Sequence, residues 1–151
     1  MERRIVREGD PVLRKMSKPV TEFNARLHEL LEDMADTMYK ADGAGLSAVQ
    51  VGILKRVFVI DVGNGIMEFI NPVLKKSSGV NKIKEEGCLS VPDKYGFVER
   101  PEHVWVSYYD RNGNFIEEQK LSGYAAKAFC HEYDHLDGIL FIDKATKIKK
   151  I

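Results

Sequence analysis

The most regular hydrophobic pattern in the chain lies in residues 24–40. Apolar side chains recur there every three or four residues, which places them on one face of a helix; they are Leu27, Leu30, Leu31, Met34 and Met38. Most other positions are polar or charged, so the segment is predicted to form an amphipathic helix with its apolar face in the core. The glycines in residues 42–45 are expected to end it, because glycine adopts left-handed conformations without strain.

Four segments with the composition of strands follow, in two pairs. They are residues 56–62 and 66–71 around Gly63-Asn64-Gly65, and residues 103–110 and 115–121 around Asn112-Gly113. Asn-Gly is a strong hairpin signal because it accepts the positive φ values of tight primed turns. The pattern therefore predicts two antiparallel hairpins.

A last helix of roughly fifteen residues is predicted over residues 123–137, with Ser122 as its N-cap and Gly138 as its C-terminal stop. The chain has 151 residues, no internal repeat and no plausible linker, so residues 1–151 are expected to form a single domain. The fold class is predicted to be α+β: antiparallel hairpins and sheets packed around a C-terminal metal-binding helix, with an N-terminal amphipathic helix.

The composition is that of a globular protein without a membrane span. Hydrophobic residues make up 44% of the chain and charged residues 30%. The longest apolar runs, residues 57–60 and 139–142, fall far short of the ~18 residues that a transmembrane helix needs. The first residues carry positive charge but no apolar stretch behind it, so a secretory signal is absent and a cytoplasmic location is expected.

Charge excludes a dedicated nucleic-acid binder. Lysine and arginine number 23, as do aspartate and glutamate, so there is no overall basic field and no sequence-specific nucleic-acid partner is expected. The basic ending KATKIKKI is expected to be a solvated end, with a transient ribosome contact as the alternative. Two cysteines in a reducing compartment are better candidates for ligands or catalysts than for a disulfide.

The last predicted helix carries the pattern His131-Glu132-Tyr133-Asp134-His135. At about 100° per residue, His135 lies about 40° round from His131 and one turn along, so both imidazoles can bind one ion. Glu132 falls about 60° beyond His135, where it can reach a water on that ion without being a ligand itself. The alternative is an exposed helix face that happens to carry two histidines.

A catalytic site of this kind needs a third protein ligand and an open position. No suitable residue follows His135, and the upstream candidates are Cys88, His28, His103 and Cys130. Cys130 lies about 100° round the helix from His131 and so points away from a shared ion. Cys88 is the best remaining choice, because it stands in a turn where Gly87 is expected to allow close backbone approach and to let the thiolate project.

Three motifs in this order resemble those of peptide deformylases. They are Gly43-Ala44-Gly45-Leu46-Ser47-Ala48-Val49-Gln50, Glu86-Gly87-Cys88-Leu89-Ser90 and the segment from His131 to Gly138. The resemblance runs from Gly9 to Asp143 and is to the compact bacterial class. Two positions depart from the usual pattern: Ser47 stands where alanine is more frequent, and Cys130 where a glutamine commonly precedes the first metal histidine.

The resemblance implies a metal-dependent hydrolase that removes the N-formyl group from the N-terminal methionine of newly synthesised polypeptides and releases formate. Cys88, His131 and His135 would hold one divalent metal ion. The family typically works with Fe2+, and Zn2+, Ni2+ and Co2+ are alternatives that cysteine and histidine can also bind. Water activated by the metal would attack the formyl carbon, with Glu132 as general base and then general acid.

The resemblance also assigns the groups around the substrate. Gln50 and the N–H of Leu89 would stabilise the oxyanion, and Gly43 and Gly45 would leave a strand free to pair with an extended peptide. Tyr124 and Ala128 lie on the helix face of His131 and are candidates to line a pocket for the methionine side chain, with ordinary core packing as the alternative. Independently of the resemblance, Glu86 and Arg100 are expected to form an ion pair that braces the cysteine loop, with a solvated pair as the alternative.

The sequence is also compatible with two other functions. One is a different metal-dependent amidase or peptidase built on the same helix. The other is a non-enzymatic module whose metal is structural, with all four positions closed by protein ligands.

Overall fold

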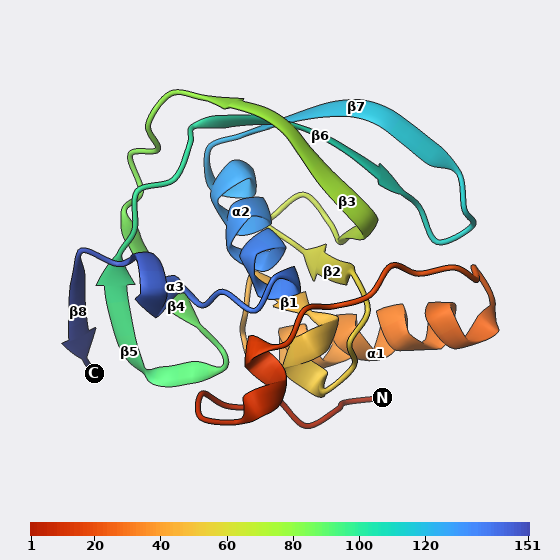
Figure 1. Cartoon of the computed structure of the whole chain (residues 1–151), viewed down its shortest axis with the longest axis horizontal. Helices are drawn as coiled ribbons and strands as arrows, with labels where there is room; N and C mark the ends of the chain where they lie inside the picture. Colours follow the sequence, from red (N-terminus) through yellow and green to blue (C-terminus); the bar gives the residue numbers. More distant parts are fainter.

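The computed structural model describes residues 1–151. With η for a 3-10 helix, its elements in chain order are η1 (Pro11–Arg14), α1 (Ala25–Lys40), β1 (Gly45–Ser47), η2 (Ala48–Val51), β2 (Val57–Ile60), β3 (Met67–Ser78), β4 (Glu85–Cys88), β5 (Val91–Phe97), β6 (His103–Tyr109), β7 (Phe115–Ser122), α2 (Tyr124–Leu136), α3 (Phe141–Lys144) and β8 (Lys147–Lys150). In Figure 1, α2 lies in the middle, β3, β6 and β7 arch over it, and α1 runs beneath β2.

The strands form two sheets in which all neighbours are antiparallel. The larger sheet has the order β1-β2-β3-β6-β7, and the smaller has the order β4-β5-β8. The predicted fold class, antiparallel sheets around a C-terminal helix with an amphipathic helix near the N-terminus, is confirmed.

Helix α1 forms as its hydrophobic pattern predicts. All five apolar positions of the pattern are buried, and they pack against β1, η2 and β2. The Asn24 side chain caps the helix by accepting a hydrogen bond from the Leu27 amide at 3.1 Å. The expected glycine exit is wrong, because the residue with positive φ is Asp42 (58°) and neither Gly43 nor Gly45 has one. Aspartate is one of the few residues that tolerates this conformation.

Both predicted hairpins are present, as β2–β3 and β6–β7. Strand β3 is longer than predicted, because it continues past a bulge and pairs with β6 as far as Ser78. The second turn is not the expected two-residue primed turn, since Gly113 alone has positive φ (84°) there. The Asp110 side chain instead accepts hydrogen bonds from the amides of Asn112 and Asn114, both at 2.9 Å, and this closes a longer turn.

Helix α2 starts one residue later than predicted. Ser122 is the last residue of β7, and the N-cap position is Gly123, whose φ of 63° allows a sharp change of direction from strand to helix. Gly138, with φ of 74°, follows the end of the helix as expected.

The apolar side of α2 packs against the larger sheet. The Phe129 ring contacts the rings of Phe58 on β2 and Phe69 on β3 edge-on, with centroids 5.2 and 5.3 Å apart. These three side chains are fully buried. The packing fixes the helix against the sheet, so that its opposite side faces β4 of the smaller sheet.

The basic end of the chain has exposed side chains, as expected of a solvated end, but its backbone forms a strand that the sequence did not predict. Residues Lys147–Lys150 form β8, which pairs with β5 and brings Ile148 opposite Gly96. A side chain at position 96 would come within 2.7 Å of the Lys147 carbonyl oxygen, so the glycine permits this close pairing. The side chains of β8 are nevertheless exposed.

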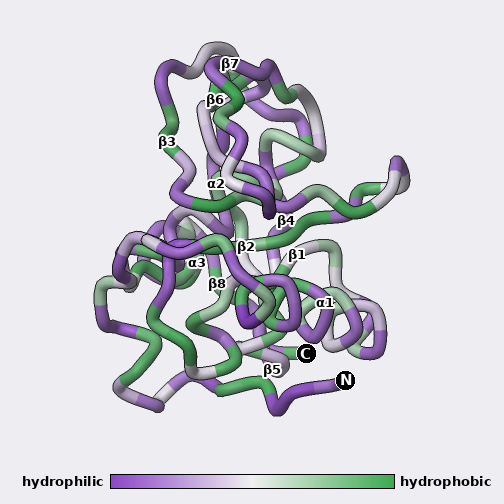
Figure 2. Tube along the Cα trace, turned by 90° about the vertical axis from the view of Figure 1, so that its right-hand side faces the viewer, coloured by the Kyte–Doolittle hydropathy of each residue, from purple (hydrophilic) through white to green (hydrophobic).

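Hydropathy along the trace agrees with this arrangement. The segment at the N-terminus is hydrophilic, and the inner strand β2 is wholly buried and apolar (Figure 2). None of the helices has both the length and the apolar character that a membrane crossing requires.

Candidate metal centre

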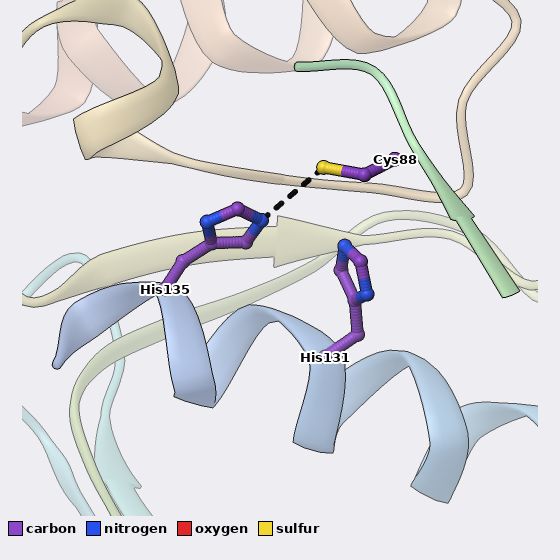
Figure 3. Close-up of side chains that lie close together, drawn as sticks. All are labelled: Cys88, His131 and His135. Atoms are coloured by element: carbon purple, nitrogen blue, oxygen red, sulfur yellow. Dashed lines mark hydrogen bonds between the residues drawn. The ribbon is translucent and has the colours of Figure 1, made fainter. Parts of the chain in front are cut away.

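Three side chains with metal-binding atoms meet between α2 and β4. Cys88, His131 and His135 each offer one ligand atom, and these atoms all lie within 4.8 Å of one another. The Cys88 sulfur is 3.4 Å from Nε2 of His135. Figure 3 shows the two rings rising from successive turns of α2 toward the cysteine at the end of β4. The structure thus brings together the three predicted ligands from distant parts of the sequence.

The backbone around Cys88 explains how its sulfur reaches the helix. The pairing of β4 with β5 shifts register between Gly87 and Cys88, so that Cys88 lies opposite Val91. Such an irregularity re-aims the side chain at the end of a strand. The expected role of Gly87 is wrong, because a side chain there would meet nothing within 4 Å and no positive φ is required.

The other candidate ligands lie elsewhere. His28 has its Nε2 2.8 Å from the Arg111 carbonyl oxygen, and His103 has its Nδ1 2.7 Å from the Ser122 hydroxyl. Cys130 is buried in the apolar core, and burial raises the pKa of its thiol to about 11. Its expected orientation away from the shared site agrees with this packing.

A cluster of buried charged side chains contacts the His131 ring at Nδ1, the nitrogen that does not face the other two ligands. Nδ1 of His131 lies 2.5 Å from Oε2 of Glu86. Because an ionised carboxylate only accepts hydrogen bonds, Nδ1 is the donor and Nε2 is left to face the other ligands. Arg100 donates to both oxygens of Glu86, at 3.1 and 2.7 Å, so the predicted brace is present.

Lys127 is a member of this cluster that the sequence did not reveal. Its side chain is 4% exposed, and Nζ lies 3.2 Å from Oε1 of Glu86 without the geometry of a hydrogen bond. A lysine inside a predominantly apolar helix segment carries no spacing signal of its own. Only the fold shows that it faces Glu86.

The electrostatics of the cluster favour a cation. Burial raises the pKa of Glu86, but hydrogen bonds from His131 and Arg100 outweigh burial and hold that pKa far below its usual value. Burial also lowers the pKa of His131, yet Glu132, Cys88 and Glu86 together raise it well above its usual value. The negative surroundings that favour a proton on this ring favour a metal cation for the same reason. Burial lowers the pKa of His135, which keeps that ring neutral as a ligand must be.

Two buried polar residues adjoin the three ligands. Glu132 is 3% exposed, and its Oε2 lies 3.8 Å from Nε2 of His131. Burial raises the pKa of Glu132, and His131 and a hydrogen bond from Ser47 partly offset that rise. Gln50 is 1% exposed, and its Nε2 lies 3.1 Å from the Ser90 hydroxyl and 3.5 Å from the Cys88 sulfur.

A cavity of about 410 Å³ opens onto this group. That volume lies within the range of small-molecule sites. Its wall includes Cys88, His131, Glu132 and Gln50 together with the other predicted substrate-contacting residues, namely Gly43, Gly45, Leu89, Tyr124 and Ala128. All the predicted site residues except His135, which is fully buried, therefore line one cavity.

The two glycines make room at the edge of this cavity. A side chain at position 45 would put its Cβ 2.6 Å from Oε2 of Glu132, and one at position 43 would come 2.6 Å from Cδ1 of Leu89. The absence of a side chain at position 45 therefore leaves space for the Glu132 carboxylate, and no positive φ is involved.

Comparison with known proteins agrees with the resemblance to peptide deformylases. The family described as polypeptide deformylase matches residues 2–151. A peptide deformylase from Caldanaerobacter subterraneus subsp. tengcongensis is 54% identical over 139 residues, which cover 92% of this chain and 86% of the relative. One from Thermotoga maritima is 48% identical over 143 residues, covering 95% and 87%.

Solved structures agree with this. The crystal structure of the Thermotoga maritima peptide deformylase superposes with a TM-score of 0.93 at 46% identity, covering 97% of this chain and 99% of that one. The enzyme of Synechococcus elongatus, solved in complex with actinonin, gives a TM-score of 0.90 at 42% identity, covering 95% and 78%. Sequence, fold and site geometry together show that the chain belongs to the peptide deformylase family.

Proposed function

We propose that Cys88, His131 and His135 hold one divalent metal ion. We further propose that Glu132, Gln50 and the Leu89 amide carry out the deformylation beside it. The chain, as a member of this family, is a metal-dependent hydrolase that removes the formyl group from the N-terminal methionine of new polypeptides. The observation that carries the residue assignment is the meeting of the three donor atoms beside Glu132 at the wall of one cavity.

The donor set fits a divalent ion. One thiolate and two imidazoles are soft to borderline ligands, and three protein ligands leave a position for a reactant. When bound, the ion would supply Lewis-acid activation of a water molecule and of the formyl oxygen. Glu86 would hold the His131 ring in the required tautomer through Nδ1.

Glu132 is assigned the proton transfers. It accepts a proton from the water that attacks the formyl carbon, and it delivers that proton to the departing amine nitrogen as the carbon–nitrogen bond breaks. The products are formate and a peptide with a free amino group. Burial, which raises the pKa of Glu132, brings the carboxyl closer to the pH at which a general base works best.

Two donors are assigned to the developing oxyanion. The Gln50 side chain presents its Nε2 on the side of Cys88 and Ser90. The Leu89 amide makes no hydrogen bond within the chain, so it is available to a ligand. Such prearranged donors stabilise charge that develops only in the transition state.

The remaining cavity residues are assigned to substrate binding. Gly43 and Gly45 line the cavity before and at the start of β1, which is an edge strand of the larger sheet, and they are assigned to pair through their backbone with an extended peptide. Ala128 is buried and Tyr124 is half exposed, and both line the cavity beside His131. They are proposed to border the space for the methionine side chain.

The identity of the metal ion and the cellular location of the reaction are proposed from chemistry. We assign Fe2+ as the physiological ion, with Zn2+, Ni2+ and Co2+ as ions that the same donors also accept. The substrate is a newly synthesised chain, so the reaction is placed in the cytoplasm. The exposed lysines of β8 are the candidate surface for a transient ribosome contact.

The test is formate release from formyl-Met-Ala-Ser by protein purified anaerobically, with the metal content measured on the same sample. Activity is expected to follow Fe2+ content and to be lost in Glu132→Ala, while the variant keeps its metal. Equal cleavage of acetyl-Met-Ala-Ser would indicate a different amidase. A metal that stays bound with no activity in the wild type would indicate a structural site instead.

A further inference from the structure

Ser47 is the residue through which β1 contacts both polar residues of the candidate mechanism. It is the last residue of β1 and is fully buried. Its hydroxyl donates to Oε1 of Glu132 at 2.9 Å and lies 3.1 Å from the Glu132 carbonyl oxygen. Its amide donates to Oε1 of Gln50 at 2.9 Å.

The hydroxyl distinguishes the two oxygens of Glu132. A serine hydroxyl has one proton, and a carboxylate is a stronger acceptor than a backbone carbonyl. Oε1 is therefore held, while Oε2 is the oxygen on the side of His131, 3.8 Å from its Nε2. Gly45 leaves room for Oε2 on its other side, since a Cβ there would come within 2.6 Å of this oxygen. The carboxylate is thus fixed in one orientation.

The backbone amide of Ser47 orients the side-chain amide group of Gln50 in a similar way. Only the carbonyl oxygen of the Gln50 side chain can accept this hydrogen bond, so the NH2 group must point the other way, toward Ser90 and Cys88. One residue of β1 therefore orients both the proton acceptor and the side-chain donor. The backbone contact is available to any residue at this position, whereas the contact to Glu132 needs the hydroxyl.

We propose that the Ser47 hydroxyl is a positioning group that keeps Oε1 of Glu132 occupied and presents Oε2 to the reacting water. The proposal rests on the assignment of Glu132 as the general base. Glu132 otherwise has few fixed contacts through its carboxylate, and a misplacement of about 1 Å can cost 10²-fold in rate. Ser47 does not touch the substrate in this arrangement, so it acts through Glu132 alone.

The kinetic test compares Ser47→Ala with Ser17→Ala. Alanine keeps the amide bond to Gln50 and removes only the hydroxyl. Ser17 is a matched control, because it is also buried but its hydroxyl has no hydrogen-bond partner. We expect kcat to fall about tenfold in Ser47→Ala, the size of one hydrogen bond to a charged group, with KM within about twofold of wild type. Ser17→Ala is expected to match the wild type.

A second readout tests the contact without activity. Urea unfolding of the metal-loaded wild type, Ser47→Ala, Glu132→Ala and the double variant gives a thermodynamic cycle. Ser47→Ala is expected to raise the unfolding equilibrium constant about tenfold in the wild type and clearly less when Glu132 is already alanine, because the hydroxyl then keeps only the carbonyl acceptor.

Three results would overturn the proposal: unchanged kcat in Ser47→Ala, an equal loss in Ser17→Ala, or equal stability effects of Ser47→Ala in both backgrounds. A wild type that releases no formate would instead overturn the assignment of the reaction, while the unfolding cycle would still report on the contact. Failure of the proposed role of Ser47 is therefore distinguishable from failure of the proposed reaction.

Discussion

The two sides of α2 are held in place by different forces. Toward the larger sheet the contacts are apolar, with Phe129 packed on Phe58 and Phe69. Toward β4 they are ionic, with Glu86 and Arg100 each only 4% exposed. Both sets of contacts are buried, but they differ in what a single substitution leaves behind.

When an apolar side chain in such a contact is truncated, the protein loses only the contacts of the removed atoms and a little packing. A buried ion pair that loses one partner leaves the other charge without compensation, which costs more than the pair contributes. The ionic side of α2 is therefore the less tolerant side, although it is not the side that supplies most of the buried apolar area. We expect function and intolerance to substitution to coincide there.

The largest effect is expected for Glu86→Leu. This change leaves Arg100, Lys127 and His131 without their shared carboxylate, and the free energy of unfolding is expected to fall by about 3–5 kcal/mol. Metal affinity is expected to fall about 10–100-fold, because His131 loses its orienting partner. Urea unfolding and metal titration measure the two effects.

Glu85→Leu is the matched control for that change. Glu85 is the preceding residue on β4, carries the same charge and is exposed, so a stability change within about 0.5 kcal/mol is expected. Equal destabilisation by both variants would show that the buried cluster has no special role.

Gln50→Leu is expected to reduce turnover by ~10²–10³, because it removes the proposed side-chain donor to the oxyanion, and such a loss costs about 2.7–4 kcal/mol in the transition state. The structure adds a second consequence, since the Ser47 amide loses its acceptor and stability falls by about 1–3 kcal/mol. Steady-state rates and thermal melts separate the two effects.

Gln119→Leu, on the outer strand β7, is the control and should leave turnover unchanged. If Gln50→Leu turned over at the wild-type rate, Gln50 would have no part in the mechanism.

The elements predicted from sequence are those whose signals are local. Helix α1 is specified by its own periodicity and its Asn24 cap, and the two hairpins by their glycine turns. The smaller sheet was missed, because β8 consists largely of exposed lysines and pairs with a strand about fifty residues earlier. Nothing in a KIKK segment indicates that partner.

The candidate site shows the same division. The histidine spacing is a property of one helix and is readable from sequence, and Cys88 followed from the need for a third ligand. The contacts of Ser47 and Lys127 join residues on different elements, so they depend on how α2 sits against β1 and β4. Sequence identified Ser47 as a departure from the family pattern but gave no reason for it.

On the apolar side of α2, Ile60→Val should have a modest effect. Ile60 is fully buried in the cluster that contains Phe129, and loss of one methylene typically costs about 0.5–1.5 kcal/mol. Catalytic turnover is expected to be unchanged, in contrast to the variants on the ionic side. Ile66→Val, at a position 39% exposed, should have almost no effect on stability. A drop in turnover caused by Ile60→Val would mean that the two sides are not independent.

The smallest effect is expected for Asp143→Asn, which breaks an ion pair on the surface. Arg14 donates to both Asp143 oxygens, at 2.5 and 3.1 Å, but the side chains are 47% and 38% exposed, so solvent screening limits the loss to below about 1 kcal/mol. The hydrogen bond from Arg14 lowers the pKa of Asp143 from 3.8, so its contribution is present above that pH and disappears as the pH falls through the lowered value. Urea unfolding at neutral and acid pH should show the difference from wild type shrinking, whereas Asp93→Asn, which breaks no ion pair, should show none. A difference that persisted in acid would contradict the electrostatic origin of this contact.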